Sequence, residues 1–207
     1  MDTFLDFKFQ KKRLLKNVSS LKKKEKDKIV ETYRQAKRYH IKQKRDEGGP
    51  YILHCLRVAS LLIEELDIKT GDVVYAAILH DSVEDTSLTF KDVKDGFGSR
   101  TYELVRNLTR KELSETELNK YQQKYKKFQE IMKKDFDTRA IKACDYLDNM
   151  MSWSYIPKGH PSRKKFPRWF REAQTMYIPL AESVDKGLVQ KMGATLNKVE
   201  WTKCSQS

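Results

Sequence analysis

The chain has 207 residues, of which 42 are basic and 29 acidic, so its formal net charge is +13. This length is enough for one sizeable domain with its own core. No apolar run approaches the ~20 residues of a membrane helix, and the N-terminus lacks the apolar core of a secretory signal. We therefore expect a soluble protein. Its positive charge favours anionic partners such as nucleotides or nucleic acid, although many proteins with neither role are also basic.

The cysteines argue against a disulfide framework. There are three of them (Cys55, Cys144 and Cys204), an odd number without close pairing, and there is no C-x-x-C motif. Free thiols of this kind are typical of a reducing cytosol, so we expect a cytoplasmic protein without a cysteine-based zinc site.

Helical spacing of apolar residues dominates the chain, and alternating strand patterns are absent. Residues 1–25 predict a basic N-terminal helix or arm, residues 26–190 one domain, and residues 191–207 a C-terminal tail. A basic loop is expected over 155–167. The predicted helices of the domain cover residues 26–44, 51–66, 72–83, 89–97, 99–108, 114–133, 137–151 and 168–186. The sequence thus predicts an all-α bundle of about eight helices.

A cluster of polar residues follows the apolar run 76–79. His80 and Asp81 are adjacent, and Glu84 and Asp85 lie three or four residues further on. On a helix these offsets place the side chains one turn apart on a shared sector. Histidine and aspartate are ligands that first-row divalent ions accept.

Two more polar residues interrupt apolar helices, namely His54 and Asp145. Taken singly, a buried histidine is more often a hydrogen-bonded core residue than a ligand, and a lone aspartate is more often a cap or a surface charge. An unpaired buried aspartate is costly, however. One cation shared by His54, His80, Asp81 and Asp145 would satisfy all four residues, and the sequence therefore predicts a metal site.

These motifs resemble those of the HD-domain metal-dependent phosphohydrolases, in particular the hydrolase domain of RelA/SpoT homologues. HIKQKRDEGGPYILH, at 40–54, is similar to that family's H-x-x-Q-x-R-x-x-G-x-P-Y-I-x-H signature. HDSVEDT resembles its HD-x-x-EDT, IKACDYLDNM its IKLADRLHNM, and YIPLA its IYAPLA. The likeness runs in order from about residue 30 to 182 and covers the hydrolase domain alone, as in the stand-alone small alarmone hydrolases.

The resemblance implies a compact HD-domain helical bundle and a role for each matched residue. Members of the family remove the 3′-diphosphate of ppGpp or pppGpp and release pyrophosphate, usually with Mn²⁺. The roles carried over are metal ligation by His54, His80, Asp81 and Asp145, handling of water and its protons by Glu84 and Asp85, packing against guanine by Arg45, and nucleotide contact by Asn149.

General chemistry agrees with these roles. A bound divalent cation activates water and neutralises phosphate charge, and a nearby carboxylate can orient that water or take its proton. A guanidinium plane such as that of Arg45 stacks on purines. The alternative interpretation is that Arg45 is a surface arginine and that Glu84 and Asp85 are surface carboxylates without a catalytic role.

Four positions depart from the family pattern. Tyr146 stands where arginine is usual, Asp148 where histidine is common, Glu47 in place of serine and Cys55 in place of proline. Asp148 and Glu47 are expected to add negative charge near a site for a polyphosphate, which leaves the exact substrate open.

Alternatives to alarmone hydrolysis follow from the basic segments. Residues 158–172 mix cationic and aromatic side chains, which suits phosphates and bases. By resemblance to small alarmone hydrolases that act as antitoxins, the substrate could be a 3′-pyrophosphorylated tRNA and the partner a toxin synthetase. Hydrolysis of another nucleotide, or a non-catalytic nucleotide- or RNA-binding role, stays open.

Overall fold

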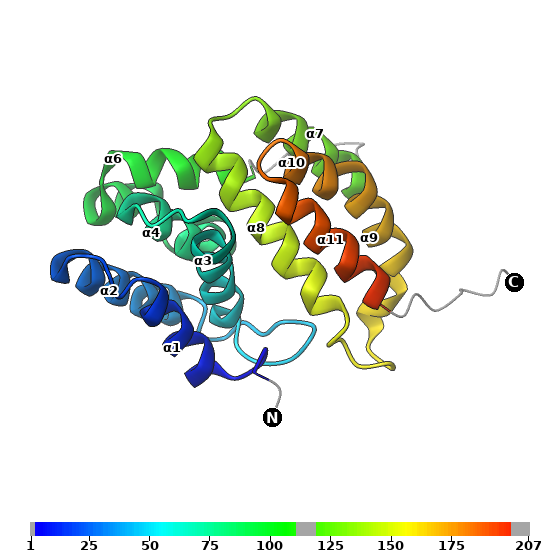
Figure 1. Ribbon diagram of the computed structural model, residues 1–207, viewed down its shortest axis with the longest axis horizontal. Helices are drawn as coiled ribbons and strands as arrows, with labels where there is room; N and C mark the ends of the chain where they lie inside the picture. The colour runs from blue at the N-terminus through cyan, green and yellow to red at the C-terminus, as the bar shows by residue number, and fades with distance from the viewer. Residues whose placement is uncertain (1–2, 111–118, 200–207) are drawn as a thin grey trace, which may run out of the picture.

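The computed structural model describes residues 3–110 and 119–199, and Figure 1 shows how their helices are arranged. Helix α3 (Ile52–Leu66) lies in the core, with every residue from Ile52 to Ile63 buried. It packs against α1 (Phe7–Asn17), α4 (Gly71–Leu79) and α8 (Phe136–Trp153). A nearly continuous apolar sequence produces this central position, because such a helix is stable only when it is covered on all sides.

The other helices cover this centre. Helices α2 (Lys23–Tyr39) and α6 (Phe90–Leu108) pack against α4, while α10 (Ile178–Glu182) and α11 (Lys186–Lys198) pack against α8. The remaining elements are α5 (Ser82–Asp85), α7 (Lys120–Met132), η1 (Pro161–Lys165), α9 (Phe166–Glu172) and η2 (Ala173–Tyr177). No strand occurs in the described ranges, so the prediction of an all-α fold is confirmed.

The basic N-terminal stretch is a helix rather than a free arm. Leu14 and Val18 are buried in the same core cluster as α3, and Phe4 is 6% exposed. The lysines of this stretch lie on the outer side, as expected for an amphipathic helix. Burial of these apolar residues fixes α1 to the bundle.

Local signals explain several helix ends. The side chain of Asp135 caps α8 by accepting a hydrogen bond from the Thr138 amide, which satisfies one of the free donors of the first turn. Gly98 has φ = +87° and ψ = 171°, and this non-helical residue divides α6 at a kink. The predicted boundary between the helices at 89–97 and 99–108 therefore corresponds to a kink where only glycine is unstrained.

Several predicted boundaries were wrong. The helix expected over 72–83 ends at Leu79, and the short α5 begins after the intervening His80 and Asp81. The expected tail from residue 191 is helical as far as Lys198, where Met192 and Leu196 are buried. The expected loop 155–167 contains η1. The helix expected over 114–133 is observed from Lys120, and residues 114–118 lie outside the described ranges. No helix in the described ranges is both long and apolar enough to cross a membrane.

Candidate metal and nucleotide site

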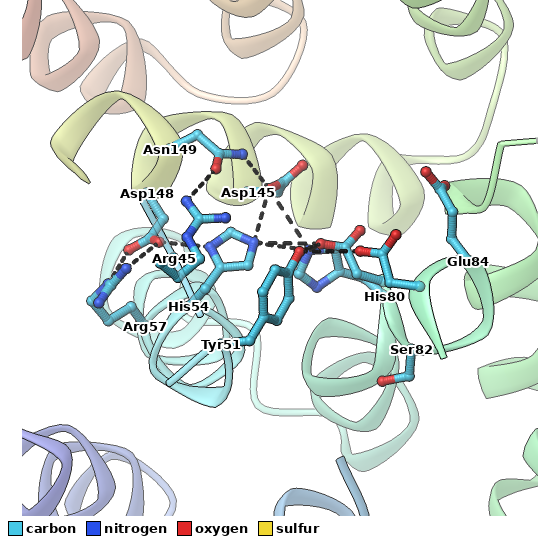
Figure 2. Close-up of polar contacts among 12 residues, drawn as sticks. Arg45, Tyr51, His54, Arg57, His80, Ser82, Glu84, Asp145, Asp148 and Asn149 are labelled. Carbon is cyan, nitrogen blue, oxygen red and sulfur yellow. Dashed lines mark hydrogen bonds and ion pairs between the residues drawn. The ribbon is translucent and has the colours of Figure 1, made fainter. Parts of the chain in front are cut away.

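Three buried helices bring four candidate ligands together (Figure 2). His54 comes from α3, His80 follows the end of α4, and Asp145 comes from α8. The Nε2 atoms of His54 and His80 are 3.2 Å apart. Asp81 Oδ2 lies 3.0 Å from His80 Nε2 and 3.7 Å from His54 Nε2. Helix packing thus places donors from distant parts of the sequence around one point.

The fourth candidate, Asp145, lies slightly apart from the other three. One donor atom from each of His54, His80 and Asp81 lies within 4.8 Å of the others, the spacing of a metal-binding group. Asp145 Oδ1 is 3.2 Å from His54 Nε2 and 3.7 Å from His80 Nε2. Its other oxygen is 2.7 Å from Lys142 Nζ. Asp145 thus places one carboxylate oxygen beside both histidine nitrogens and the other on a lysine.

Hydrogen bonds orient both imidazoles toward this point. His80 Nδ1–H donates to the carbonyl of Ala77 at 2.8 Å, and His54 Nδ1–H donates to Asp148 Oδ2 at 2.7 Å. Nδ1 of each ring is therefore the donor and Nε2 faces the other ring, which is the arrangement of metal-binding histidines. When the rings are neutral, two Nε2 lone pairs face each other across 3.2 Å. A cation at that point satisfies both.

The charge balance also fits a cation. Burial alone would lower the pKa of His80, but the Asp81 carboxylate beside it raises that pKa to about 10. Asp145 is buried as well, yet Lys142 and the two histidines hold its pKa well below the usual range. Both carboxylates therefore stay charged, and protons compete with any metal for the histidine nitrogens. The donor set of imidazole nitrogens and carboxylate oxygens suits a first-row divalent ion.

A set of residues not singled out as site residues from the sequence holds Asp81 and α5 in place. The Tyr51 hydroxyl donates to Asp81 Oδ2 at 2.5 Å, and the His40 ring stacks on Tyr51 with centroids 4.6 Å apart. His40 Nε2 also accepts a hydrogen bond from the Ser82 hydroxyl at 3.1 Å, and Gln43 Nε2 donates to the Asp85 carbonyl at 2.6 Å. His40, Gln43 and Tyr51 all lie in the family-like signature at 40–54. That likeness is the sequence feature that could have identified them as site residues.

The two acidic residues after Asp81 have different environments. Glu84 accepts hydrogen bonds from Arg110, at 2.8 Å from its backbone N–H and 2.6 Å from its Nε. Figure 2 shows Glu84 to one side of the histidine pair. Within residues 3–110 and 119–199, Asp85 forms no ion pair with a basic side chain. Burial, then the charges of Asp81 and Glu84, raise the pKa of Asp85 to about 6. Asp85 therefore has the proton affinity of a general base near neutral pH.

Two adjoining cavities lie beside the histidine pair. The metal-side cavity has a volume of about 170 Å³ and is bounded by Asp81, Asp85 and Asp145 together with the cationic Arg110, Lys124, Lys127 and Lys142. The second, of about 290 Å³, is lined by Trp153, Ile156 and Trp169. Arg45, Tyr51, Lys124, Asn149 and Tyr177 line both. A charged compartment thus leads into an aromatic one.

The loop 44–50 places Arg45 between the two cavities. Gly48 and Gly49 have φ of +91° and +80°, values that side-chain-bearing residues rarely adopt. This tight loop is closed by the hydrogen bond from the Gly48 amide to the Arg45 carbonyl at 2.9 Å. The Arg45 guanidinium donates to Asn149 Oδ1 at 2.7 Å, and Asn149 donates to Asp145 Oδ1 at 2.6 Å. The two expected nucleotide residues therefore contact each other next to an expected metal ligand.

Asp148 and Glu47 lie next to the candidate site, as expected, but as paired charges: Glu47 lines the second cavity and Asp148 contacts His54. Asp148 is 0% and Glu47 4% exposed, and both accept hydrogen bonds from the buried Arg57. Arg57 supplies one positive charge for the two carboxylates, and Arg45 Nε also donates to Glu47 Oε1 at 3.2 Å, so that each carboxylate has a cationic partner. Tyr146 stacks on Tyr177 with centroids 3.9 Å apart, and Cys55 is buried in α3.

Comparison with known proteins identifies the class. The family model described as an HD domain matches residues 32–185. The chain therefore belongs to the HD-domain family, and the resemblance seen in the sequence is confirmed.

Individual relatives indicate which members of the HD-domain family this chain resembles. The guanosine-3′,5′-bis(diphosphate) 3′-pyrophosphohydrolase MESH1 of Drosophila melanogaster is 31% identical over 160 residues, covering 76% of this chain and 82% of the relative. An Aquifex aeolicus protein with the same activity in its name is 35% identical over 160 residues. The match covers 75% of this chain but 21% of that relative, so the chain spans about a fifth of its length. The solved structure of a metazoan ortholog of SpoT that hydrolyses ppGpp has a TM-score of 0.72 and 27% identity, over 84% of this chain and 96% of the other.

Proposed function

We propose that this chain is a metal-dependent 3′-pyrophosphohydrolase of guanosine alarmones, with Mn²⁺ as its ion. The observation that carries the proposal is the convergence of four donors on one point beside a cationic cavity that opens into an aromatic one. A 3′-diphosphate fits the cationic compartment, and a purine fits the aromatic one. The similarity to MESH1 along most of its length supports the same substrate class.

In this proposal His54, His80, Asp81 and Asp145 hold the ion. A divalent cation bound there supplies an activated nucleophile at neutral pH and neutralises phosphate charge. Water adds to the phosphorus that leaves as pyrophosphate, the bond from that phosphorus to the 3′ oxygen breaks, and the 3′ oxygen takes up a proton. Asp85 accepts the proton of the attacking water, because burial and the charges of Asp81 and Glu84 raise its pKa to about 6.

The surrounding side chains orient the substrate. Arg45 stacks its guanidinium plane on the guanine, and Asn149 contacts the nucleotide while it is hydrogen-bonded to Asp145. Arg110 and Lys127 line the metal-side cavity and neutralise the phosphates. Glu84 has Arg110 as its partner, so its role in this proposal is to position that arginine rather than to move protons.

The test is release of pyrophosphate from ppGpp by purified protein with Mn²⁺, with and without chelator, beside the Asp81→Ala variant. Mn²⁺-dependent release that the variant lacks is the expected result. Absence of release from protein shown to bind Mn²⁺ would contradict alarmone hydrolysis and direct attention to other nucleotides. A non-catalytic binder would retain its function when Glu84→Gln and Asp85→Asn are combined, whereas an enzyme would bind metal and lose turnover.

A second candidate substrate is a tRNA with a pyrophosphorylated 3′ end. A groove of about 860 Å³ adjoins the metal-side cavity through Arg110 and Lys127, and Arg106, Lys133 and Lys134 extend its positive charge. Such a chain would counteract a toxin synthetase by removing that enzyme's product. Binding of tRNA that weakens steeply as salt increases would support this candidate, and absence of binding at low salt would reject it.

A further inference from the structure

A buried ion cluster lies behind the candidate metal site. Arg57 on α3 is 1% exposed, and its guanidinium contacts Asp148 twice, at 2.6 Å from Nε to Oδ1 and 3.0 Å from Nη2 to Oδ2. The same Nη2 donates to Glu47 Oε1 at 3.0 Å. All three charged side chains are removed from solvent, and such groups are retained only when each is paired.

The cluster touches a candidate ligand directly. Asp148 Oδ2, one of the two oxygens held by Arg57, accepts the Nδ1–H of His54 at 2.7 Å. His80 differs, because its Nδ1–H donates to the neutral carbonyl of Ala77. A carboxylate behind an imidazole raises the basicity of the opposite nitrogen and fixes the orientation of the ring. The Nε2 atoms of the two histidines therefore differ in basicity, and so in their affinity for a cation.

Neighbouring aromatic side chains keep the cluster dry. The Arg57 guanidinium lies over the Phe4 ring at 3.9 Å, and Phe4 stacks on Tyr155 with centroids 4.2 Å apart. Arg57 also donates to the Phe4 carbonyl at 3.3 Å. Exclusion of water strengthens the electrostatic effect of each charge on its neighbours. Glu47 and Asp148, the two acidic departures from the family pattern, both bind Arg57 in this water-excluded cluster.

We propose that Asp148, held by both of its oxygens on Arg57, is a positioning residue that orients His54 and sets the affinity of this chain for its divalent ion. The inference rests on the proposed metal site but not on the identity of the substrate. Asp148 and Arg57 act through His54 and do not contact the substrate. Loss of such a partner behind a metal-binding histidine typically weakens metal affinity by about 10–100-fold.

The experiment measures binding of Mn²⁺ to chelator-treated, full-length protein by titration calorimetry. The variant Asp148→Asn keeps the shape and one acceptor oxygen but loses the charge, so about tenfold weaker binding is expected. Arg57→Lys keeps the positive charge but cannot contact both oxygens of Asp148, and it should give a smaller loss. The matched control is Glu172→Gln. Glu172 is equally buried, has Lys124 at 2.6 Å and contacts none of the four ligands, so this variant should bind Mn²⁺ as the wild type does.

Thermal unfolding in chelator separates positioning from simple support of the fold. If Asp148→Asn and Glu172→Gln lose similar stability and Asp148→Asn alone loses Mn²⁺ affinity, the proposal holds. If Asp148→Asn binds Mn²⁺ with wild-type affinity, or if the control weakens binding equally, the proposal is wrong. A wild-type protein that binds no Mn²⁺ would contradict the metal site and this inference together, whereas Mn²⁺ binding without ppGpp turnover would contradict the proposed substrate alone.

Discussion

The histidine pair and the aromatic cavity lined by Trp153, Ile156 and Trp169, here called the nucleotide side, are built in different ways. His54 and Asp145 lie on buried helices and His80 directly follows one, and each is held by at least one further hydrogen bond or ion pair. The nucleotide side uses long or aromatic side chains from a glycine loop, α7 and α9, such as Arg45, Lys124 and Trp169. The first region uses donors that belong to the core, while long side chains such as Arg45 and Lys124 in the second have more rotatable bonds.

This difference separates chemistry from recognition. Changes among the buried donors should abolish metal binding and turnover together, because no neighbouring group can replace them. Changes on the nucleotide side should alter substrate affinity and leave metal binding intact. Asn149 joins the regions, since it donates to Asp145 and accepts from Arg45.

The largest effect is expected from Asp81→Asn. This substitution removes one charged metal ligand and leaves a neutral amide oxygen as the acceptor of the Tyr51 hydroxyl. A catalytic cation supplies several kcal/mol of transition-state stabilisation, so turnover should fall by about a thousandfold or more. Titration of Mn²⁺ should show a parallel loss of affinity. Turnover at the wild-type level would mean that the histidine pair is not the catalytic centre.

The next effect separates the two acidic residues. Asp85→Asn should lower kcat by about 10²–10⁴-fold, the usual contribution of a general base, with Mn²⁺ affinity retained. Glu84→Gln should cost less, because Glu84 is paired with Arg110. In the wild type, kcat should rise with pH through about 6, as Asp85 loses its proton. Equal losses in both variants would contradict this assignment.

On the nucleotide side, Arg45→Lys should raise KM by about tenfold and change kcat little. The substitution keeps the charge but removes the planar group that stacks on a base, a contact worth about 1–2 kcal/mol. The control is Mn²⁺ affinity, which should stay at the wild-type value. A fall in kcat without a change in KM would mean that Arg45 serves the metal region instead.

The smallest effect concerns stability. The folded protein raises the pKa of Asp85, so this residue favours folding at low pH and its contribution is lost as pH rises through about 6. In chelator at pH 8, Asp85→Asn should therefore unfold at a slightly higher temperature than the wild type. The difference should shrink toward pH 4. A variant less stable at pH 8 would show that the carboxylate has favourable contacts in the fold.

Much of the fold could be predicted because helices leave a periodic pattern in the sequence. Helix α3 was expected over 51–66 and observed over Ile52–Leu66, since its apolar residues and the glycine loop before it mark both its face and its start. The predicted helix boundaries were wrong where tertiary contacts determine the end of a helix. Helix α4 begins at Gly71 and ends at Leu79, although no glycine or proline follows to end it. We attribute this end to tertiary hydrogen bonds, because Asp81 binds Tyr51 and Ser82 binds His40.

The residue types that can bind a cation, a phosphate and a base are evident from the sequence, where they occur in family-like motifs at 40–54, 80–86 and 141–150. Which of these residues are partners is evident only in the packed helices. Asp148 and Glu47 read as excess negative charge, yet they meet on Arg57, and Glu84 meets Arg110. The physical reason is that charge pairing depends on distances of a few ångströms between residues up to about a hundred positions apart, and packing of the helices sets those distances.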